Sequence, residues 1–401
     1  MAEQSFKYII VGGGLAGASA IQGIREVDTK GPILLIGAEK HLPYDRPPLT
    51  KKLWFGKKKV EDIFLQKKDF YDNNGVTLLL GTNAVELDAT HKTVTDENGE
   101  TYRYEKLLIA TGGLPRSLPI AGGDLEGLCY YRTLDDYENI RKQAVEGASA
   151  IIIGGGFIGS EIAAALNMNK IDVTMIYPSS YLVNKVFPEQ LGVALQKHFM
   201  EKGIRIFAKS KPELITAGHH RFITKIENGP AIESDMVIVG VGISPVLDLA
   251  RTAGLDTGNG IVVNEFLQTS NPDIYAAGDN AFFPYQALGI KTRVEHWDNA
   301  LTQGKYAGRN MAGEKESYTH MPYFFSDLFE FGYEAVGEVN SELDIFCDWQ
   351  KENDTGVIYY MRDKKVRGVM LCNIWEKVEV AREMIKSGKK YKHKDLRDAI
   401  R

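Results

Sequence analysis

The N-terminal part of the chain alternates apolar runs with small residues. Residues 7–11 form a largely apolar run, which predicts a buried parallel strand. A glycine cluster at 12–17 follows at once, and the alanines behind it favour a helix over about 15–25 with its small side chains facing a sheet. A second apolar run at 33–36 leads to the acid Glu39. The pattern therefore predicts a strand, a glycine turn, a helix and a second strand that ends at an acid.

The glycines in this turn have the spacing of a dinucleotide-binding fingerprint, G-x-G-x-x-G. The first makes the turn tight, the second lets the backbone approach a pyrophosphate, and the third lets the helix pack closely. The helix N-terminus then offers N–H groups to phosphate, and the acid suits a ribose diol. A glycine-rich turn in an unrelated α/β fold is the alternative. The residues predicted to bind this dinucleotide are Gly12, Gly14, Leu15, Ala16, Gly17 and Glu39.

The same pattern occurs a second time. Residues 149–153 form an apolar strand, a second glycine fingerprint follows, and a helix is predicted over 160–168. This copy predicts a second Rossmann-like unit and not a solenoid repeat. Two dinucleotides in one chain suit hydride chemistry between a nicotinamide donor and a flavin acceptor. The residues predicted to bind the second dinucleotide are Gly154, Gly156, Phe157, Ile158 and Gly159.

Several further motifs carry a specific resemblance. They are LPYDRPPLTK at 42–51, LLIATGG at 107–113, IYAAGD at 274–279, VEHW at 294–297, FFSDL at 324–328 and GYE at 332–334. With both fingerprints, the chain resembles the FAD-dependent pyridine nucleotide oxidoreductases. Within them it is most similar to the branch of apoptosis-inducing factor, ferredoxin reductase and rubredoxin reductase. The resemblance extends over nearly the whole chain.

The resemblance implies an α/β fold with two Rossmann-like dinucleotide-binding domains of the glutathione-reductase-like, three-layer ββα type, plus a small C-terminal α+β domain. We expect a discontinuous FAD domain at 1–115 and 245–318, an NAD(P)H domain at 116–244 and a C-terminal domain at 319–401. In the last, runs at 357–361 and 366–372 predict a hairpin, and 375–386 predicts a helix. A scaffold role for this domain is favoured over acceptor recognition.

The resemblance also implies further FAD contacts. Arg46 is expected at the FAD phosphate or adenosine, with a surface salt bridge as the alternative. Asp279 is expected at the flavin ribityl chain, with a helix N-cap as the alternative. Trp297 begins a helix directed at the flavin pyrimidine, or is simply core. Phe325 stands where the family commonly has Trp, and it lacks the indole N–H donor. The other residues implied in FAD binding are Ala110, Thr111, Gly112, Glu295 and His296.

Lys51 and Glu161 are the predicted catalytic residues. In related enzymes a matching Lys–Glu pair lies beside flavin N5, and Lys51 is also predicted to contact the cofactor. A buried cation there favours the anionic reduced flavin, while the carboxylate keeps the lysine charged. An ordinary structural ion pair is the alternative.

The choice between NADH and NADPH stays open. The strand at 173–176 is followed by Tyr177 and then Pro-Ser-Ser, with neither the acid of NAD readers nor the Arg of NADP readers. Lys185 is a candidate phosphate partner, although a solvated lysine is the simpler interpretation. NADH is slightly favoured. Tyr177 and Gly242 are predicted to line this cofactor site.

The absence of a cysteine near the LPY motif limits the possible electron acceptors. Positions where relatives carry a redox cysteine hold Lys40 and His41. A thiol relay is therefore not expected, and a flavin alone suits one-electron carriers such as ferredoxin or rubredoxin. The first alternative is a reductase of small molecules such as quinones or monodehydroascorbate. The second is an NADH-responsive signalling flavoprotein with slow turnover, like apoptosis-inducing factor.

Composition adds limits to this interpretation. The net charge of −5 gives no support for nucleic-acid binding, there is no apolar run of transmembrane length, and we expect no signal peptide before the strand at residue 7. Three distant cysteines and no Cys/His cluster predict a reduced cytoplasmic protein without a metal. A homodimer is an open expectation. Two lysine-rich segments, around 51–68 and 386–401, are candidates for docking an acidic carrier, although lysine runs are more often solvated faces.

Overall fold

The computed structural model describes residues 4–219 and 221–400, and contacts within it divide the chain into two compact units. Unit 1 comprises the residues up to Asp45, together with Val60–Leu114 and Pro245–Phe324. Unit 2 comprises Arg46–Lys59, Pro115–Ser244 and the residues from Phe325 onward. The strands β7 (Gly113–Pro115) and β16 (Ile243–Pro245) contain two of the points where the chain passes between units.

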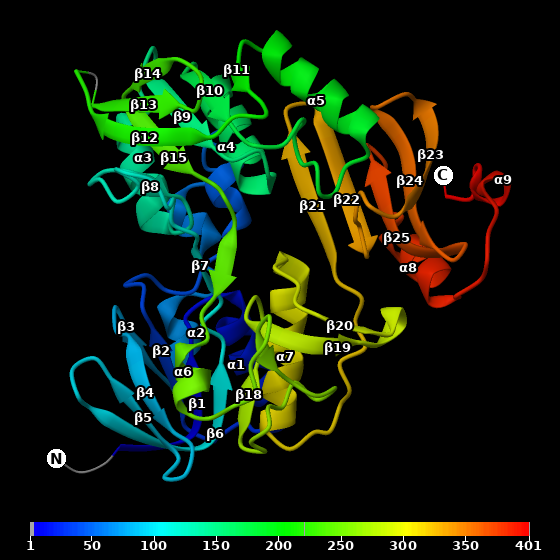
Figure 1. The fold of residues 1–401 in the computed structure, drawn as a ribbon. Coiled ribbons are helices and arrows are strands. Elements are labelled where there is room, and N and C mark those ends of the chain that lie inside the picture. Colours follow the sequence, from blue (N-terminus) through cyan, green and yellow to red (C-terminus); the bar gives the residue numbers. More distant parts are fainter. Residues whose placement is uncertain (1–3, 220, 401) are drawn as a thin grey trace. The chain divides into compact units, whose positions relative to one another are not determined.

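Unit 1 is built on a seven-stranded sheet in the order β3-β2-β1-β6-β5-β4, with β18 also pairing with β6 (Figure 1). The strands β3, β2, β1, β6 and β18 run parallel, whereas β5 and β4 are antiparallel additions at the edge. The apolar runs of β1 and β2 are almost fully buried, as a sheet covered on both faces requires. The bounds are β1 (Gln4–Val11), β2 (Ile33–Gly37), β3 (Val76–Leu80), β4 (Ala84–Asp88), β5 (Thr93–Asp96), β6 (Thr101–Ile109) and β18 (Ile274–Ala276).

The helices α1 (Leu15–Val27) and α7 (Trp297–Met311) of unit 1 lie against each other through glycines. A Cβ placed on Gly304 would lie 2.2 Å from the carbonyl oxygen of Ala16, and one on Gly308 would lie equally close to that of Ala20. Small residues therefore permit this backbone contact. The remaining elements of unit 1 are η2 (Val60–Ile63), α2 (Lys68–Asn73), α6 (Asp248–Thr252), β17 (Ile261–Val262), β19 (Ala281–Tyr285), η3 (Gln286–Leu288) and β20 (Ile290–Thr292).

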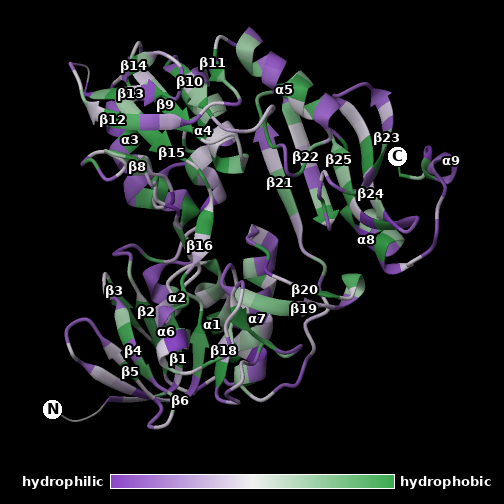
Figure 2. Ribbon diagram, in the orientation of Figure 1, coloured by the Kyte–Doolittle hydropathy of each residue, from purple (hydrophilic) through white to green (hydrophobic). Residues whose placement is uncertain are grey.

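Unit 2 contains a second parallel sheet, in the order β11-β10-β9-β15-β8. A small antiparallel sheet, β12-β13-β14, packs its apolar side chains onto that sheet, and α4 lies against β9 and β10, so that this part has the expected ββα layers. Figure 2 shows hydrophobic residues concentrated in these strands. The bounds are β8 (Cys129–Tyr130), α3 (Leu134–Gln143), β9 (Ser149–Ile153), α4 (Phe157–Met168), β10 (Asp172–Ile176), α5 (Glu189–Glu201), β11 (Arg205–Phe207), β12 (Pro212–Ala217), β13 (Phe222–Ile226), β14 (Ala231–Ser234) and β15 (Met236–Val239).

The C-terminal part of unit 2 is a five-stranded sheet in the order β21-β22-β25-β24-β23, with α8 packed on β22 and β25 (Figure 1). The predicted hairpin is present between β24 and β25, and Asp363 and Lys364 at its turn have positive φ angles of 52° and 65°. The predicted helix at 375–386 begins three residues later, at Val378. The bounds are β21 (Tyr323–Leu328), β22 (Phe331–Gly337), β23 (Asp344–Lys351), β24 (Thr355–Arg362), β25 (Lys365–Cys372), α8 (Val378–Lys386) and α9 (His393–Leu396).

The division of the chain differs from the expected domains in two respects. Arg46–Lys59, expected in the FAD domain, belongs to unit 2, because the Tyr131 hydroxyl donates to the Leu49 carbonyl and Trp54 packs edge-on against Tyr137. The NAD(P)H and C-terminal domains, expected as separate bodies, fall within one unit. Within the part of the chain that the structure describes, no helix is long and apolar enough to cross a membrane.

Candidate functional site

The first glycine turn has the close packing that its fingerprint predicts. Gly12 has a φ of 127°, and a Cβ there would lie 2.1 Å from the Ala110 carbonyl oxygen. A Cβ on Gly17 would lie 2.1 Å from the Gly12 carbonyl oxygen. By contrast, nothing lies within 4 Å of a Cβ on Gly14, the N-cap of α1, and no side chain caps this helix. The backbone N–H groups at Leu15 and Ala16 therefore begin a helix that can receive a phosphate above Gly14.

The acid at the end of the second strand is held by the LPYD motif. The Tyr44 hydroxyl donates to Glu39 Oε2 at 2.5 Å, so the side chain of the residue predicted to bind the ribose is already oriented.

Gly112, in the turn after β6, has a positive φ of 64°. Next to it, the Thr111 hydroxyl donates to the Val246 carbonyl at 3.1 Å.

The environment of Asp279 excludes one of its two interpretations. The element after it is the strand β19 and not a helix, so the N-cap alternative is wrong. The next residue, Asn280, is fully buried and donates to the Thr111 hydroxyl at 2.9 Å. Asn280 thereby joins two turns predicted to hold FAD. The sequence analysis missed it, although its place directly after Asp279 in the IYAAGD motif was a usable indication.

The start of α7 combines two rings with an exposed acid. Trp297 is half-buried and its indole N–H donates to Asp45 Oδ1 at 2.8 Å, so it is more than core filling. His296 stacks on Phe324, with ring centroids 4.2 Å apart. Burial lowers the pKa of His296 to about 4, and its ring is therefore neutral at neutral pH. Glu295 is exposed and forms an ion pair with a neighbouring arginine.

The second glycine turn, in unit 2, repeats the geometry of the first. Gly154 has a φ of 126°, and a Cβ on Gly159 would lie 2.1 Å from its carbonyl oxygen. Gly156 is the N-cap of α4, again without a capping side chain and without any atom within 4 Å of a Cβ. Gly242, with a φ of 98°, faces equally open space. This turn can therefore hold a second phosphate group in the same way.

The other side chains predicted at the second turn are placed differently. Tyr177 is 1% exposed, lies behind Gly155 and donates its hydroxyl to Gln196 Oε1 at 2.8 Å. Burial also raises its pKa. Its side chain thus supports the turn and is not available to a ligand, which corrects the expectation of direct contact. Phe157 is half-buried and Ile158 is 42% exposed on the first turn of α4.

Lys51 and Glu161 meet in a buried ion pair. The Lys51 ammonium lies 3.2 Å from Glu161 Oε1, and the two residues are 7% and 8% exposed. Hydroxyl groups hold both carboxylate oxygens: Thr50 donates to Oε2 and Ser326 donates to Oε1, each at 2.5 Å. Both oxygens of this buried carboxylate thus have hydroxyl partners besides the ammonium. The helix predicted over 160–168 begins three residues earlier, at Phe157, so Glu161 lies in its second turn.

The lysine of this pair also contacts β21. Its ammonium lies 4.6 Å from the centroid of the Phe325 ring and 4.0 Å from Asp327 Oδ2. Residues from η1 (Pro47–Thr50) and its C-cap, from α4 and from β21 therefore form one cluster, which we call the Lys51 cluster. It consists of Thr50, Lys51, Glu161, Phe325, Ser326 and Asp327. The sequence analysis missed Thr50 and Ser326, although each adjoins a residue that it named.

Arg46 has a backbone partner within unit 2. Its guanidinium Nη1 donates to the Arg132 carbonyl oxygen at 2.8 Å, within unit 2. The expected contact with FAD phosphate or adenosine stays a prediction.

Comparison with known proteins decides the family. Residues 6–304 match the pyridine nucleotide-disulphide oxidoreductase family. The chain belongs to this family. Residues 307–355 and 346–387 match a second family, the C-terminal domain of mitochondrion-associated apoptosis-inducing factor. This oxidoreductase is FAD-dependent and uses NAD(P)H, in agreement with its two glycine turns.

Individual relatives extend over most of the oxidoreductase. Apoptosis-inducing factor 1, mitochondrial, of Dictyostelium discoideum is 33% identical, covering 95% of this chain and 78% of its own. Rubredoxin-NAD(+) reductase of Pseudomonas putida is 35% identical, covering 80% and 83%. Among solved structures, the covalent putidaredoxin reductase–putidaredoxin complex gives a TM-score of 0.91 at 31% identity, covering 99% of this chain and 96% of the other.

These comparisons confirm the expected branch of the family, the fold class, the reductase function and the two cofactors. They do not test the roles of individual residues. The roles of Lys51, Glu161 and the glycine-turn residues stay predictions that rest on the geometry above, and the domain bounds stay predictions beside the two units of the structure.

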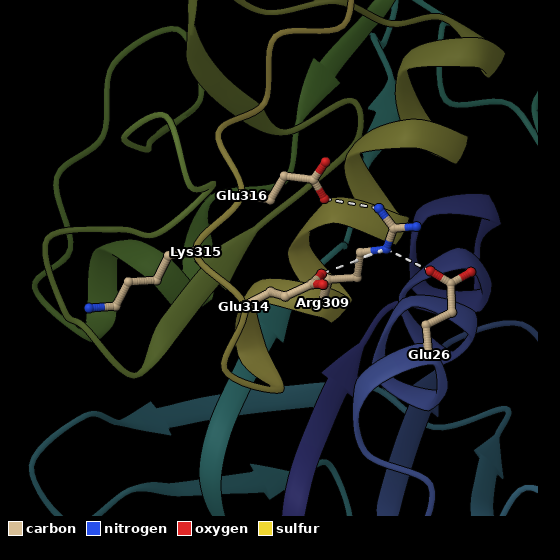
Figure 3. Close-up of a pocket in the computed structure, with 5 residues that line it drawn as sticks. All are labelled: Glu26, Arg309, Glu314, Lys315 and Glu316. Carbon is tan, nitrogen blue, oxygen red and sulfur yellow. Dashed lines mark hydrogen bonds and ion pairs between the residues drawn. The ribbon is translucent and has the colours of Figure 1, made fainter.

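The surface pocket drawn in Figure 3 is lined by residues outside both glycine turns and the Lys51 cluster. Its lining is an ion-pair network in which Arg309 lies 2.6 Å from Glu26 and 2.9 Å from Glu316. Four of the five lining residues are thus joined by ion pairs, whereas the fifth, Lys315, is exposed and lies outside this network. In the ranges 4–219 and 221–400, no group of three or more His, Cys, Asp or Glu residues has metal-binding geometry, and no cysteine is in a disulfide.

Proposed function

We propose that this oxidoreductase passes electrons from NAD(P)H through FAD to a small redox carrier protein of the ferredoxin or rubredoxin type. The observation that carries the proposal is the pair of glycine turns with matching geometry, each open above its second glycine. When bound, FAD supplies a two-electron acceptor that can release electrons singly. The named activities of the rubredoxin reductases and of putidaredoxin reductase support a protein carrier.

The cysteines support the same acceptor class. Cys129 and Cys372 are buried and their thiol pKa values are raised by that burial, which disfavours the reactive thiolate. Cys347 is half-buried and its pKa is raised to about 11 for the same reason. None of them is a good thiol relay, so electrons leave most simply by direct transfer. Three unpaired cysteines also suit the cytoplasm, which is where we place the protein.

We assign the hydride step to Lys51 and Glu161. Their burial excludes water and keeps a fixed positive charge within the Lys51 cluster. Thr50 and Ser326 act as positioning residues because they fix both oxygens of Glu161, which in turn orients the ammonium. Phe325 covers one side of that ammonium and completes the enclosure.

Only part of the lysine-rich sequence is available for docking a carrier. Lys51 is buried in its ion pair, and Lys68 is paired with Asp72 at 2.9 Å. Lys52 and Lys57 are exposed, as are Lys389, Lys390, Lys392 and Lys394 near the C-terminus. Lys59 and Lys67 are exposed as well, so both segments present exposed lysines to an acidic partner.

The match to the C-terminal domain of apoptosis-inducing factor favours a second candidate function, an NADH-responsive signalling flavoprotein. The two candidates differ in turnover. A carrier reductase is reoxidised quickly by its partner, whereas a sensor stays reduced and changes its oligomeric size when NADH is added. A homodimer belongs to this second proposal.

One experiment separates these functions. The purified protein is reduced anaerobically with NADH or NADPH, and reoxidation is followed at 450 nm with ferredoxin, rubredoxin, a quinone and monodehydroascorbate at two salt concentrations. Fast reoxidation by a carrier, falling as salt rises, supports the proposal. Fast reoxidation only by small molecules, or slow reoxidation with a shift in size-exclusion volume, would replace it. A colourless preparation that takes up no flavin would end it.

A further inference from the structure

The segment between β10 and α5, residues 177–187, occupies the place where a Rossmann fold recognises the adenosine ribose. We call it the ribose loop. It touches the glycine turn directly, because the Val183 N–H donates to the Gly155 carbonyl at 2.8 Å. Val183 has a φ of 54°, a left-handed conformation that a β-branched residue rarely adopts. Such a conformation persists only when the surroundings hold it.

The C-terminal domain provides hydrogen bonds that hold this loop. The Ser341 hydroxyl donates to the Asn184 carbonyl at 2.6 Å, and the Ser341 N–H donates to the Lys185 carbonyl at 3.0 Å. The Tyr360 hydroxyl, from the middle of β24, donates to the Val186 carbonyl at 2.8 Å. Three consecutive carbonyl groups of the ribose loop are thus bonded to residues more than 150 positions later in the chain.

Aromatic packing anchors the end of the same loop. Phe187 is fully buried and meets Tyr333 and Phe331 of β22 edge-on, with ring centroids 5.3 and 6.1 Å apart. The loop therefore has its N-terminal half against the glycine turn and its C-terminal half against the C-terminal sheet. Both contact sets lie within unit 2.

We propose that the C-terminal domain is a positioning element for the nicotinamide dinucleotide, acting through Ser341 and Tyr360 on the ribose loop. The inference rests on the proposed use of the second glycine turn for NAD(P)H. It gives the C-terminal domain a part in cofactor affinity besides that of scaffold. Neither residue touches the cofactor. Each fixes backbone carbonyls, and these fix Val183 against Gly155.

The test compares Ser341→Ala, Tyr360→Phe and the double variant with the wild-type protein loaded with FAD. Binding of ADP-ribose and 2′-phospho-ADP-ribose, measured by calorimetry, reports on the dinucleotide without its nicotinamide ring. Each variant loses one hydrogen bond, so the dissociation constant of the tighter probe should rise about fivefold per substitution. KM for NAD(P)H should rise in parallel, while kcat changes little.

A matched control is available on the same strand. Tyr359 neighbours Tyr360, is equally buried and makes no hydroxyl contact with the ribose loop. Tyr359→Phe should leave probe binding unchanged, and Ser341→Thr, which keeps a hydroxyl, should restore part of the affinity. Unchanged probe binding in the double variant overturns the inference, as does an equal loss in Tyr359→Phe. A wild-type protein that binds neither probe refutes the assignment of the second turn itself, which is a distinct outcome.

Discussion

The two glycine turns of this oxidoreductase have nearly identical backbone geometry, but the residues that follow them differ. Gly12 and Gly154 have φ angles of 127° and 126°, and the third glycine of each turn approaches the first equally closely. The same three-glycine spacing thus produces the same phosphate cradle twice, because only hydrogen fits where the helix meets the turn.

The two turns differ in the helix that follows each of them. Two residues after the third glycine, the first helix carries Ser19, whereas the second carries Glu161, the carboxylate of the Lys51 cluster. The strands that follow also differ, since one leads to Glu39 and the other to Ser179. The helix behind the first turn thus carries a small hydroxyl group at this position, whereas the helix behind the second carries a charged group. Two glycine turns with the same geometry are therefore followed by different side-chain chemistry.

The largest expected effect comes from adding a methyl group to the third glycine of each turn, in two separate variants. Gly17→Ala places a methyl group 2.1 Å from the Gly12 carbonyl oxygen and should abolish retention of FAD. Gly159→Ala has the same clash with Gly154 and should leave a yellow protein that NAD(P)H no longer reduces. Flavin absorbance and anaerobic bleaching measure the two effects. Gly258→Ala, where a Cβ meets nothing within 4 Å, is the control. Loss of FAD in both variants would show that the cradles are not independent.

The next effect concerns the charge that only the second helix carries. Lys51→Met removes the buried ammonium and should slow flavin reduction about 100-fold, the scale for losing one fixed electrostatic group. Stopped-flow absorbance measures the rate. Lys52→Met changes an exposed neighbour and should have no effect. If reduction by Lys51→Met keeps the wild-type rate, the ion pair is structural only.

A smaller effect should follow from filling the open space above each turn. Gly14→Ala and Gly156→Ala meet no atom of the protein within 4 Å, so the melting temperature without cofactor should stay within a few degrees of wild type. A methyl group directed at a pyrophosphate should still weaken FAD and NAD(P)H respectively, by about tenfold. Calorimetric titration gives both constants. An affinity that does not change places the phosphate elsewhere.

The smallest effect tests the ribose positions. Ser179→Glu places an acid after β10, where the sequence has none of the acids typical of NAD-binding folds. The ratio of kcat/KM for NADH to kcat/KM for NADPH should then rise by about tenfold or less. Ser179→Gln is the uncharged control of equal size. A ratio that moves equally in both variants would mean that size, and not charge, decides.

Much of the candidate site could be predicted because its features are local. The strand, glycine turn and helix lie within about 20 residues, and their geometry follows from sterics at adjacent positions. The hairpin at Asp363 and Lys364 is local in the same sense. Tyr177 was misplaced because a tyrosine after a strand end can face either the ligand or the glycine turn, and only packing against Gly155 and Gln196 decides.

By itself, the sequence determined the two dinucleotide folds from the spacing of their glycines, and its resemblance to related enzymes indicated the family and the pair Lys51 and Glu161. Only the tertiary structure decided that Thr50 and Ser326 hold the carboxylate, that residues 46–59 belong with the second unit, and that Ser341 and Tyr360 hold the ribose loop. Those contacts join residues 82 to 174 positions apart. No local pattern encodes them, since hydroxyl groups and lysines look alike in sequence whether they meet a partner or water.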